Sequence, residues 1–347
     1  MTTDAAYPLR TDPGPDPDPA EPGPPGPAEL CRAVARRFTA LVDGGALRLP
    51  LPGSGRTRER FRRLADLGRE DLCVARLAEG HTDAVAILHE LGGPAVRPGE
   101  RWGVWAAHPP GPGVHAHRDG AAWRLTGVKP YCSGAQTCTH TLITADSDDG
   151  RRLFAVRVAG PAVTPVPGTW QAVGMAGSDS LDVRFSDAPA EPVGDVDGYV
   201  RRPGFQHGGL GVAACWLGGA RAVAATLYAE AARRPLDAHA AAHLGEVDVL
   251  LHAAGTVLEQ AADAVDDDPC DRGGGARLRS LRVRALVERV CTDVLHHVGR
   301  ATGAGPLCRD AAHARAVADL GVYLRQHHAE RSAEELARLL TETEGRP

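Results

Sequence analysis

Three regions of this chain differ in how apolar and polar positions alternate. Between residues 29 and 97, and again from residue 201 to 347, apolar residues recur every three or four positions, as expected for helices with one buried face. Between residues 98 and 200 apolar residues tend to alternate with polar ones, as expected for half-buried strands. The predicted order is therefore a helical unit, a β unit and a second helical unit.

The first helical unit contains three predicted helices. They cover the runs ELCRAVARRFTALV, RERFRRLADLG and DLCVARLAEGHTDAVAILHEL, and glycines end the first and third. The second helical unit contains four long amphipathic runs with short connections, which predicts an antiparallel four-helix bundle. Its first run, after Gly209, is rich in Gly and Ala, so another backbone could approach it closely.

Two hairpins are predicted in the middle region. Asp119-Gly120, a dipeptide typical of primed turns, joins runs that begin at Val114 and Trp123. The segment DSDDG joins runs that begin at Thr141 and Leu153, and a further alternating run begins at Leu181. Several short strands within about 100 residues favour a small barrel or sandwich, so the predicted fold class is α+β.

Composition narrows the function classes. The chain has 347 residues and a net charge of -5, which provides no basic surface and makes nucleic acid an unlikely partner. We expect no membrane span and no signal peptide, because neither a long uncharged apolar window nor an apolar leader stands out. Residues 1–28 are mostly Pro, Asp and Gly and are predicted to be a disordered tail.

Cysteine, histidine and lysine usage adds little chemistry by itself. The 8 cysteines show no C-x-x-C spacing and are expected to be reduced thiols in a cytoplasmic protein. His115 and His117 would face the same way on a strand, but no third zinc ligand is nearby, so no metal site is predicted. The adjacent pair His296 and His297 should point about 100° apart on a helix and form no joint site. Lys129 is the only lysine.

Common nucleotide-binding and hydrolase motifs are absent from the sequence. It contains no G-x-G-x-x-G after a strand, no Walker loop and no G-x-S-x-G elbow.

Three blocks of the sequence resemble the acyl-CoA dehydrogenase superfamily, in family order, between about residues 101 and 328. The first block is AAWRLTGVKPYCSG, similar to the family's W-x-L-x-G-x-K-x-aromatic-x-[ST] run. The second is WQAVGMAGSDSLDVRFS, and the third is HHVGRATGAGPLCRDAAHAR. The matching residues are Trp123, Leu125, Gly127, Lys129, Tyr131, Ser133, Trp170, Gly174, Met175, Gly177, Ser178, Val183, Phe185, Gly299, Pro306, Arg309, Asp310 and Ala311.

The resemblance implies a shortened member of this family that binds FAD between the β unit and the bundle. Tyr131 would pack against the flavin ring, and the hydroxyl of Ser133 would hydrogen-bond N5. The alternative is that Tyr131 is a core aromatic of the barrel and Ser133 a turn residue. Gly299, in the third block, is assigned to the same cofactor.

The match is incomplete around the flavin. The run WGVWAAHPPGPG corresponds to the family's other flavin strand and assigns Trp105, Ala107 and His108 to the site, but Ala107 stands where a hydroxyl residue is usual. The segment ARRPLDAHAAAHLGE lacks the family's Phe-Gly and Gln for the pyrophosphate. Arg234 remains as a candidate phosphate ligand, with ordinary surface charge as its alternative.

The family's catalytic carboxylate is also missing. Its usual glutamate position falls near Ala318, and the alternative position falls near Val212. Asp319, beside the first of these, is the candidate base that would remove a proton next to a thioester carbonyl. An exposed helical aspartate is the alternative.

Three functions follow from the resemblance. The first is a FAD-dependent oxidoreductase that acts on the CH–CH bond of an acyl thioester. The second is a flavin-dependent monooxygenase of the same fold, and the third is a non-catalytic relative that serves in binding or assembly. All three imply a homo-oligomer, and the first two a small-molecule substrate.

Overall fold

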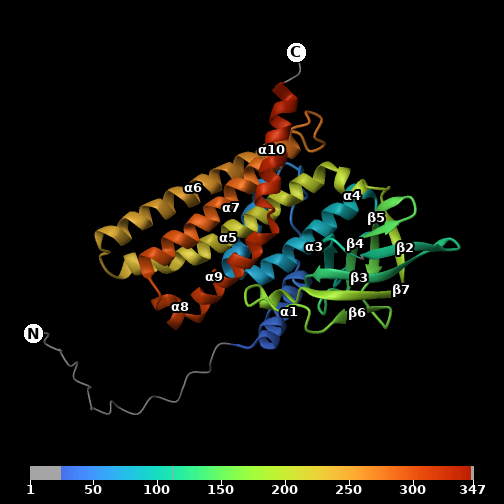
Figure 1. Ribbon diagram of the computed structural model, residues 1–347, viewed down its shortest axis with the longest axis horizontal. Helices are drawn as coiled ribbons and strands as arrows, with labels where there is room; N and C mark the ends of the chain where they lie inside the picture. The colour runs from blue at the N-terminus through green and yellow to red at the C-terminus, as the bar shows by residue number, and fades with distance from the viewer. Residues whose placement is uncertain (1–24, 112, 345–347) are drawn as a thin grey trace, which may run out of the picture.

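The computed structural model describes residues 25–111 and 113–344. Its first helical unit has three helices, as predicted. They are α1 (Pro27–Asp43), α2 (Thr57–Glu70) and α3 (Leu72–Leu91). Asp71 caps α3 by accepting hydrogen bonds from two backbone amides of its first turn, and Gly92 ends the helix with a φ of 68°. This unit packs between the β unit and the C-terminal helices, with α3 in contact with both (Figure 1).

The predicted tail is slightly too long. Residues 1–24 of the predicted segment 1–28 lie outside the described residues, whereas α1 begins at Pro27. A proline is favoured in the first turn of a helix, because its missing N–H would have no partner there and its φ is already helical.

The β unit is a barrel, which settles the choice between barrel and sandwich. Strands β2, β3, β7, β5 and β4 pair in turn, and β4 pairs back onto β2, so the sheet closes. The bounds are β1 (Trp102–Trp105), β2 (Val114–Asp119), β3 (Ala122–Cys132), β4 (His140–Ser147), β5 (Gly150–Arg157), β6 (Val163–Val166), η1 (Ala176–Ser178) and β7 (Leu181–Val193).

Both predicted hairpins form. β2 pairs with β3 up to Asp119 and Ala122, and β4 pairs with β5 up to Ser147 and Gly150. β1 pairs with β4 in parallel, so that Trp105, the last residue of β1, lies beside Ile143 of β4.

The C-terminal unit contains three long helices that lie side by side and a shorter fourth (Figure 1). The predicted fourth long helix is only 13 residues, because Asp310 caps it late and a 3-10 turn ends it at Leu324. The bounds are α4 (Gly198–Arg201), α5 (Pro203–Arg233), α6 (Ala238–Asp267), α7 (Ala276–Thr302), α8 (Gly305–Arg309), α9 (Ala311–Tyr323), η2 (Leu324–Gln326) and α10 (Ala329–Glu344).

Small residues of α5 let the backbone of another helix of the same chain approach closely. A Cβ on Gly218 would lie 2.1 Å from the carbonyl oxygen of Ala65, and one on Gly68 would lie 2.4 Å from that of Cys215. The backbones of α2 and α5 therefore cross in close contact. Within the described residues, α5 is also the one helix long and apolar enough to cross a membrane, and 72% of its most apolar window is buried in the molecule.

One large cluster of buried side chains runs through all three units. It includes Phe38 of α1, Leu125 of β3, Trp216 of α5 and Val287 of α7. The division into units at residues 29–97, 98–200 and 201–347 stays a prediction, because the cluster crosses both boundaries.

Candidate functional site

The ends of β1 and β3 meet at the residues expected to hold a flavin. The indole Nε1 of Trp105 donates to the backbone carbonyl of Ser133 at 3.0 Å. Trp105 is fully buried and packs edge-on against Phe185, so it fixes the position of Ser133 from inside the barrel. The structure thus brings together two predicted site residues that lie 28 positions apart.

Tyr131 lies in a strained turn just before Ser133. Its φ is 60°, in the left-handed region that bulky residues rarely adopt, and its side chain is 55% exposed. The pairing of β3 with β7 shifts between Lys129 and Cys132, which is a bulge that redirects the intervening side chains. Tyr131 is therefore not a core aromatic of the barrel, and its ring is open to a ligand.

Lys129 lies beneath this turn. Its side chain is buried, and Nζ donates to the carbonyl oxygen and the hydroxyl of Thr144 at 2.7 and 2.9 Å. Burial lowers the pKa of the Lys129 ammonium to about 8. Because β3 and β4 are not neighbours in the sheet, these bonds join the two strands across the interior of the barrel.

A second strained turn, residues 174–180, lies against the first. Met175 and Asp179 have φ of 58° and 48°. The backbone amides of Gly134 and Ala135 donate to the carbonyls of Ser178 and Asp179 at 2.8 and 3.1 Å. Gly174 is required, because a Cβ there would lie 2.0 Å from the carbonyl oxygen of Ala318 on α9.

Three serine hydroxyls connect the two turns. Ser133 Oγ lies 2.8 Å from Ser180 Oγ, which lies 2.8 Å from Ser178 Oγ. Ser178 Oγ donates to the carbonyl of Met175 at 2.7 Å. All three serines are buried, with Ser133 the most accessible at 9%.

Asp319 is buried and anchors the second turn to α9. One carboxylate oxygen accepts from the backbone amide of Met175, and the other lies 3.3 Å from Nε of Arg315 and 3.7 Å from the thiol of Cys73. Burial raises the pKa of Asp319, while the Met175 amide and Arg315 oppose that shift. Asp319 is therefore not the exposed helical residue of the alternative interpretation. Its role as a base stays a prediction.

Ala107 and His108 follow β1 on the rim of the barrel. Ala107 is half-buried and offers no hydroxyl, and His108 is exposed with Nε2 2.7 Å from a guanidinium nitrogen of Arg151. His115 and His117, on β2, lie near Asp148 and Asp187 in exposed positions. No group of three or more His, Cys, Asp or Glu suited to a metal ion is found in residues 25–111 and 113–344.

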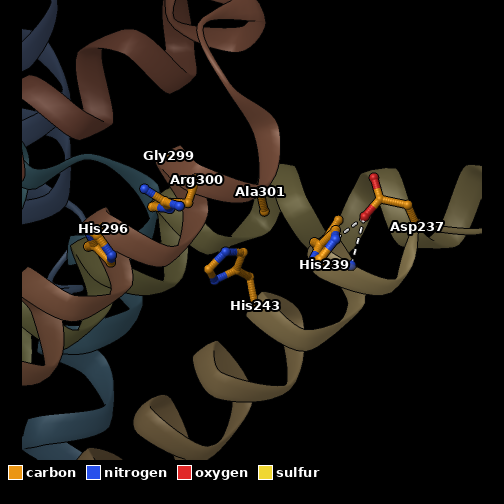
Figure 2. Close-up of a pocket in the computed structure, with 8 residues that line it drawn as sticks. Asp237, His239, His243, His296, Gly299, Arg300 and Ala301 are labelled. Carbon is orange, nitrogen blue, oxygen red and sulfur yellow. Dashed lines mark hydrogen bonds between the residues drawn. The ribbon is translucent and has the colours of Figure 1, made fainter.

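Gly299 lies elsewhere, in a polar cavity of about 520 Å³ at one end of the bundle (Figure 2). The cavity is formed by the first turns of α6 and the last turns of α7. Arg234 does not line it and instead pairs with Glu230 on α5. The lining residues are Asp237, His239, Ala240, His243, His296, Gly299, Arg300 and Ala301.

Three of the residues that line this cavity are histidines. Nδ1 of His243 lies 2.9 Å from Nδ1 of His297, so these rings form a pair across two helices. Burial and the neighbouring His297 and Arg300 lower the pKa of His243. Sequence reasoning considered His297 only beside His296 and missed its partner 54 residues away, since no local spacing reports which helices lie side by side.

The cavity and the strained turns lie far apart in one chain. The ends of α6 and α7 that form the cavity are at the left of Figure 1, and the barrel is at the right. The predicted site residues therefore separate. Trp105, Ala107, His108, Tyr131 and Ser133 lie on the barrel, with Asp319 of α9 against the second strained turn. Gly299 of α7 and Arg234 at the end of α5 lie on the bundle.

Comparisons with known proteins identify the fold. No known protein family matches the sequence, and no curated protein matches it. Solved structures do match along nearly the whole chain. Methanesulfinate monooxygenase MsuC from Pseudomonas fluorescens is 16% identical with a TM-score of 0.71, and the match covers 92% of this chain and 97% of that one.

Two further structures contain bound FMN. Dibenzothiophene monooxygenase TdsC from Paenibacillus sp. A11-2, in complex with FMN and indole, is 17% identical with a TM-score of 0.71 over 91% of this chain and 97% of its own. KijD3, in complex with FMN and dTDP-3-amino-2,3,6-trideoxy-4-keto-3-methyl-D-glucose, is 19% identical with a TM-score of 0.72 over 94% and 96%. The chain has the acyl-CoA dehydrogenase-like fold, and the predicted fold class is confirmed.

Proposed function

We propose that this chain is a flavin-dependent monooxygenase that oxygenates a small organic molecule. The observation that carries the proposal is the structural match, over more than nine-tenths of the chain, to flavin monooxygenases. When bound, reduced flavin supplies the two electrons with which one atom of O2 enters the substrate and the other leaves as water. This is the second of the three functions that the sequence resemblance implies.

The contacts of Asp319 favour oxygenation over acyl-CoA dehydrogenation. Dehydrogenation needs a carboxylate that can reach a substrate proton. Both oxygens of Asp319 are engaged, one by the Met175 amide and the other by Arg315, and the carboxylate is almost fully buried. Turning Asp319 toward a substrate would break the bond that holds the second strained turn on α9.

The barrel residues fit one face of a flavin ring. The exposed ring of Tyr131 offers a flat apolar surface, and Ser133 follows it with a hydroxyl. Trp105 holds the backbone of Ser133 in place, so the hydroxyl and the aromatic ring keep a fixed relation. The two strained turns concentrate unfavourable backbone conformations at this point, a feature that clusters at ligand sites.

The histidine-lined cavity is suited to the flavin phosphate. Arg300 carries a positive charge, and the imidazole rings of His239, His243 and His296 offer N–H groups that can donate to phosphate oxygens. Because this cavity is remote from Tyr131 within one chain, a single flavin would take its ring site from one copy and its phosphate site from another. The proposal therefore includes a homo-oligomer.

FMN fits this chain better than the FAD implied by the resemblance. The segment that holds the FAD pyrophosphate in the family is short here and lacks the Phe-Gly and Gln residues. FMN has a single phosphate and no adenosine to hold. The flavin bound in two of the solved monooxygenase-like structures is FMN.

Flavin titration of the purified protein tests the proposal. We expect FMN to bind more tightly than FAD, and Tyr131→Ala to weaken binding about fivefold, because an aromatic stacking contact contributes about 1 kcal/mol. The matched control is Tyr228→Ala, which removes another exposed tyrosine, on α5, and should leave the dissociation constant unchanged.

Two outcomes would favour the other functions. Bleaching of bound flavin by an acyl-CoA without oxygen would support acyl-CoA dehydrogenation as the function instead. Failure to bind flavin in either redox state would leave the non-catalytic binding or assembly role.

A further inference from the structure

We propose that Ser178 and Ser180 are positioning residues that force Ser133 to accept a hydrogen bond from the flavin, so that the site selects reduced over oxidised flavin. This inference rests on the proposed function, because it concerns the same ring site. It follows from the number of hydrogens available along the serine chain.

The direction of the chain is fixed at its inner end. The carbonyl oxygen of Met175 has no hydrogen, so at 2.7 Å the hydroxyl of Ser178 must donate to it. If Ser178 donated elsewhere, two oxygen atoms would face each other at that distance without a hydrogen between them. The single hydrogen of Ser178 is therefore used.

The remaining hydrogens follow in turn. Ser180 must donate to Ser178, since Ser178 has none left to give, and the two oxygens are 2.8 Å apart. Ser133 must then donate to Ser180, also at 2.8 Å. The hydroxyl hydrogen of Ser133 points inward, and only its lone pairs remain for a ligand.

The inner end of the chain is itself held rigidly. The Met175 amide donates to Asp319, and the Met175 carbonyl also accepts from the indole of Trp170 at 3.2 Å. Burial of Ser178 and Ser180 removes water as a competing partner, since they are 1% and 6% exposed. Rotation of any one hydroxyl would leave a buried group without its hydrogen bond, which is unfavourable.

The two redox states of flavin differ at the atom concerned. N5 of oxidised flavin has a lone pair and no hydrogen, so it can only accept. N5 of reduced flavin has a hydrogen and can donate. A serine hydroxyl that can only accept forms a hydrogen bond with the N5–H group of the reduced ring. Facing the oxidised ring, the lone pairs of the serine oxygen would repel the lone pair of N5.

The test compares dissociation constants of FMN in the two redox states, measured by quenching of protein fluorescence, with reduced FMN titrated anaerobically. The wild-type protein should bind reduced FMN more tightly than oxidised FMN. In Ser178→Ala, Ser180 can donate to Ser133, which frees the hydrogen of Ser133 for oxidised N5. We expect the preference for reduced FMN to fall by about threefold to tenfold, the value of one hydrogen bond.

Two further variants separate this effect from a loss of structure. Ser178→Thr keeps a hydroxyl and should retain the wild-type preference. Ser180→Ala removes the acceptor of Ser133 and should lower the preference as Ser178→Ala does, and it serves as the test should Ser178→Ala not fold.

Two results would overturn the inference. Equal affinity of the wild-type protein for both redox states would do so, as would a preference that neither alanine variant changes; the proposed function would survive either. An absence of binding in both redox states would overturn the proposed function as well.

Discussion

Three non-glycine residues with positive φ gather around the serine chain. Tyr131, Met175 and Asp179 each adopt a backbone conformation that costs about 1 kcal/mol or more. Resemblance to a family identified the two blocks that contain them, but no sequence rule predicts a left-handed tyrosine or methionine. The conformation comes from packing against α9 and from hydrogen bonds between the two turns.

The pKa of Lys129 can be measured directly and reports whether its side chain is buried inside the barrel. Because it is the only lysine, protein labelled with [13Cε]lysine should give one NMR signal from this side chain. We expect that signal to titrate with a midpoint near pH 8, since burial disfavours the charged ammonium. A midpoint near 10.5, the ordinary value, would mean that the side chain reaches solvent.

The lowered pKa of Lys129 also sets the sign of a stability effect. The pKa of Lys129 is about 8 in the folded chain and about 10.5 in the unfolded chain. The contribution of the uncharged Lys129 side chain to the free energy of unfolding is therefore fully present above pH 10.5 and is lost as the pH falls through 8. Relative to Lys129→Met, which does not titrate, the wild-type protein should become more stable between pH 7 and 10, by roughly 3 kcal/mol at most. Urea unfolding of both proteins across this range gives the difference.

Asp319 and His297 mark the limit of prediction for single residues. The family pattern puts the glutamate position near Ala318, with Asp319 beside it, yet the contacts of Asp319 with Met175 and Cys73 come from other elements than its own helix. Likewise, the pairing of His297 with His243 depends on how α6 and α7 align. Contacts between distant elements carry no local signature, so they could not be predicted.

Glycines decide how the helices α2 and α5 pack. Gly218→Ala should lower the free energy of unfolding by about 2 kcal/mol, because the new methyl group would overlap the carbonyl of Ala65. Gly245→Ala in α6 is the matched control, since nothing lies within 4 Å of its Cβ position. That change should raise the free energy of unfolding by about 0.5–1 kcal/mol through helix propensity alone.

Chemical denaturation of both variants checks this contrast. A stable Gly218→Ala variant would show that α2 and α5 can move apart without loss, and the close crossing would then have no energetic role.

Elements with a strong local signal were predicted well. Alternation and turn residues located both hairpins, and glycines located the end of α3. The closure of the barrel was not predictable, because β1 and β2 both join β4 through parallel pairings between separate parts of the chain. The short length of α9 was missed because its apolar pattern continues into the 3-10 turn at Leu324.

The continuous core suggests that the whole molecule unfolds as one unit. Buried residues of the barrel and of both helical units belong to one cluster. We expect thermal unfolding followed by far-ultraviolet circular dichroism, which reports helices, to coincide with unfolding followed by tryptophan fluorescence. Three of the five tryptophans, Trp102, Trp105 and Trp123, lie in the barrel, so fluorescence reports that unit.

Separate transitions would contradict this expectation. A barrel signal that changes at a lower temperature than the helical signal would support the predicted division at residues 98–200.

The buried position of the only lysine has a practical consequence for chemical labelling. Amine-directed reagents such as succinimidyl esters and aldehydes react with accessible neutral amines, and Lys129 as a whole residue is only 3% exposed. In the native state Lys129 is therefore protected from these reagents. Its rate of modification would report how often the barrel opens, at one known position of the chain.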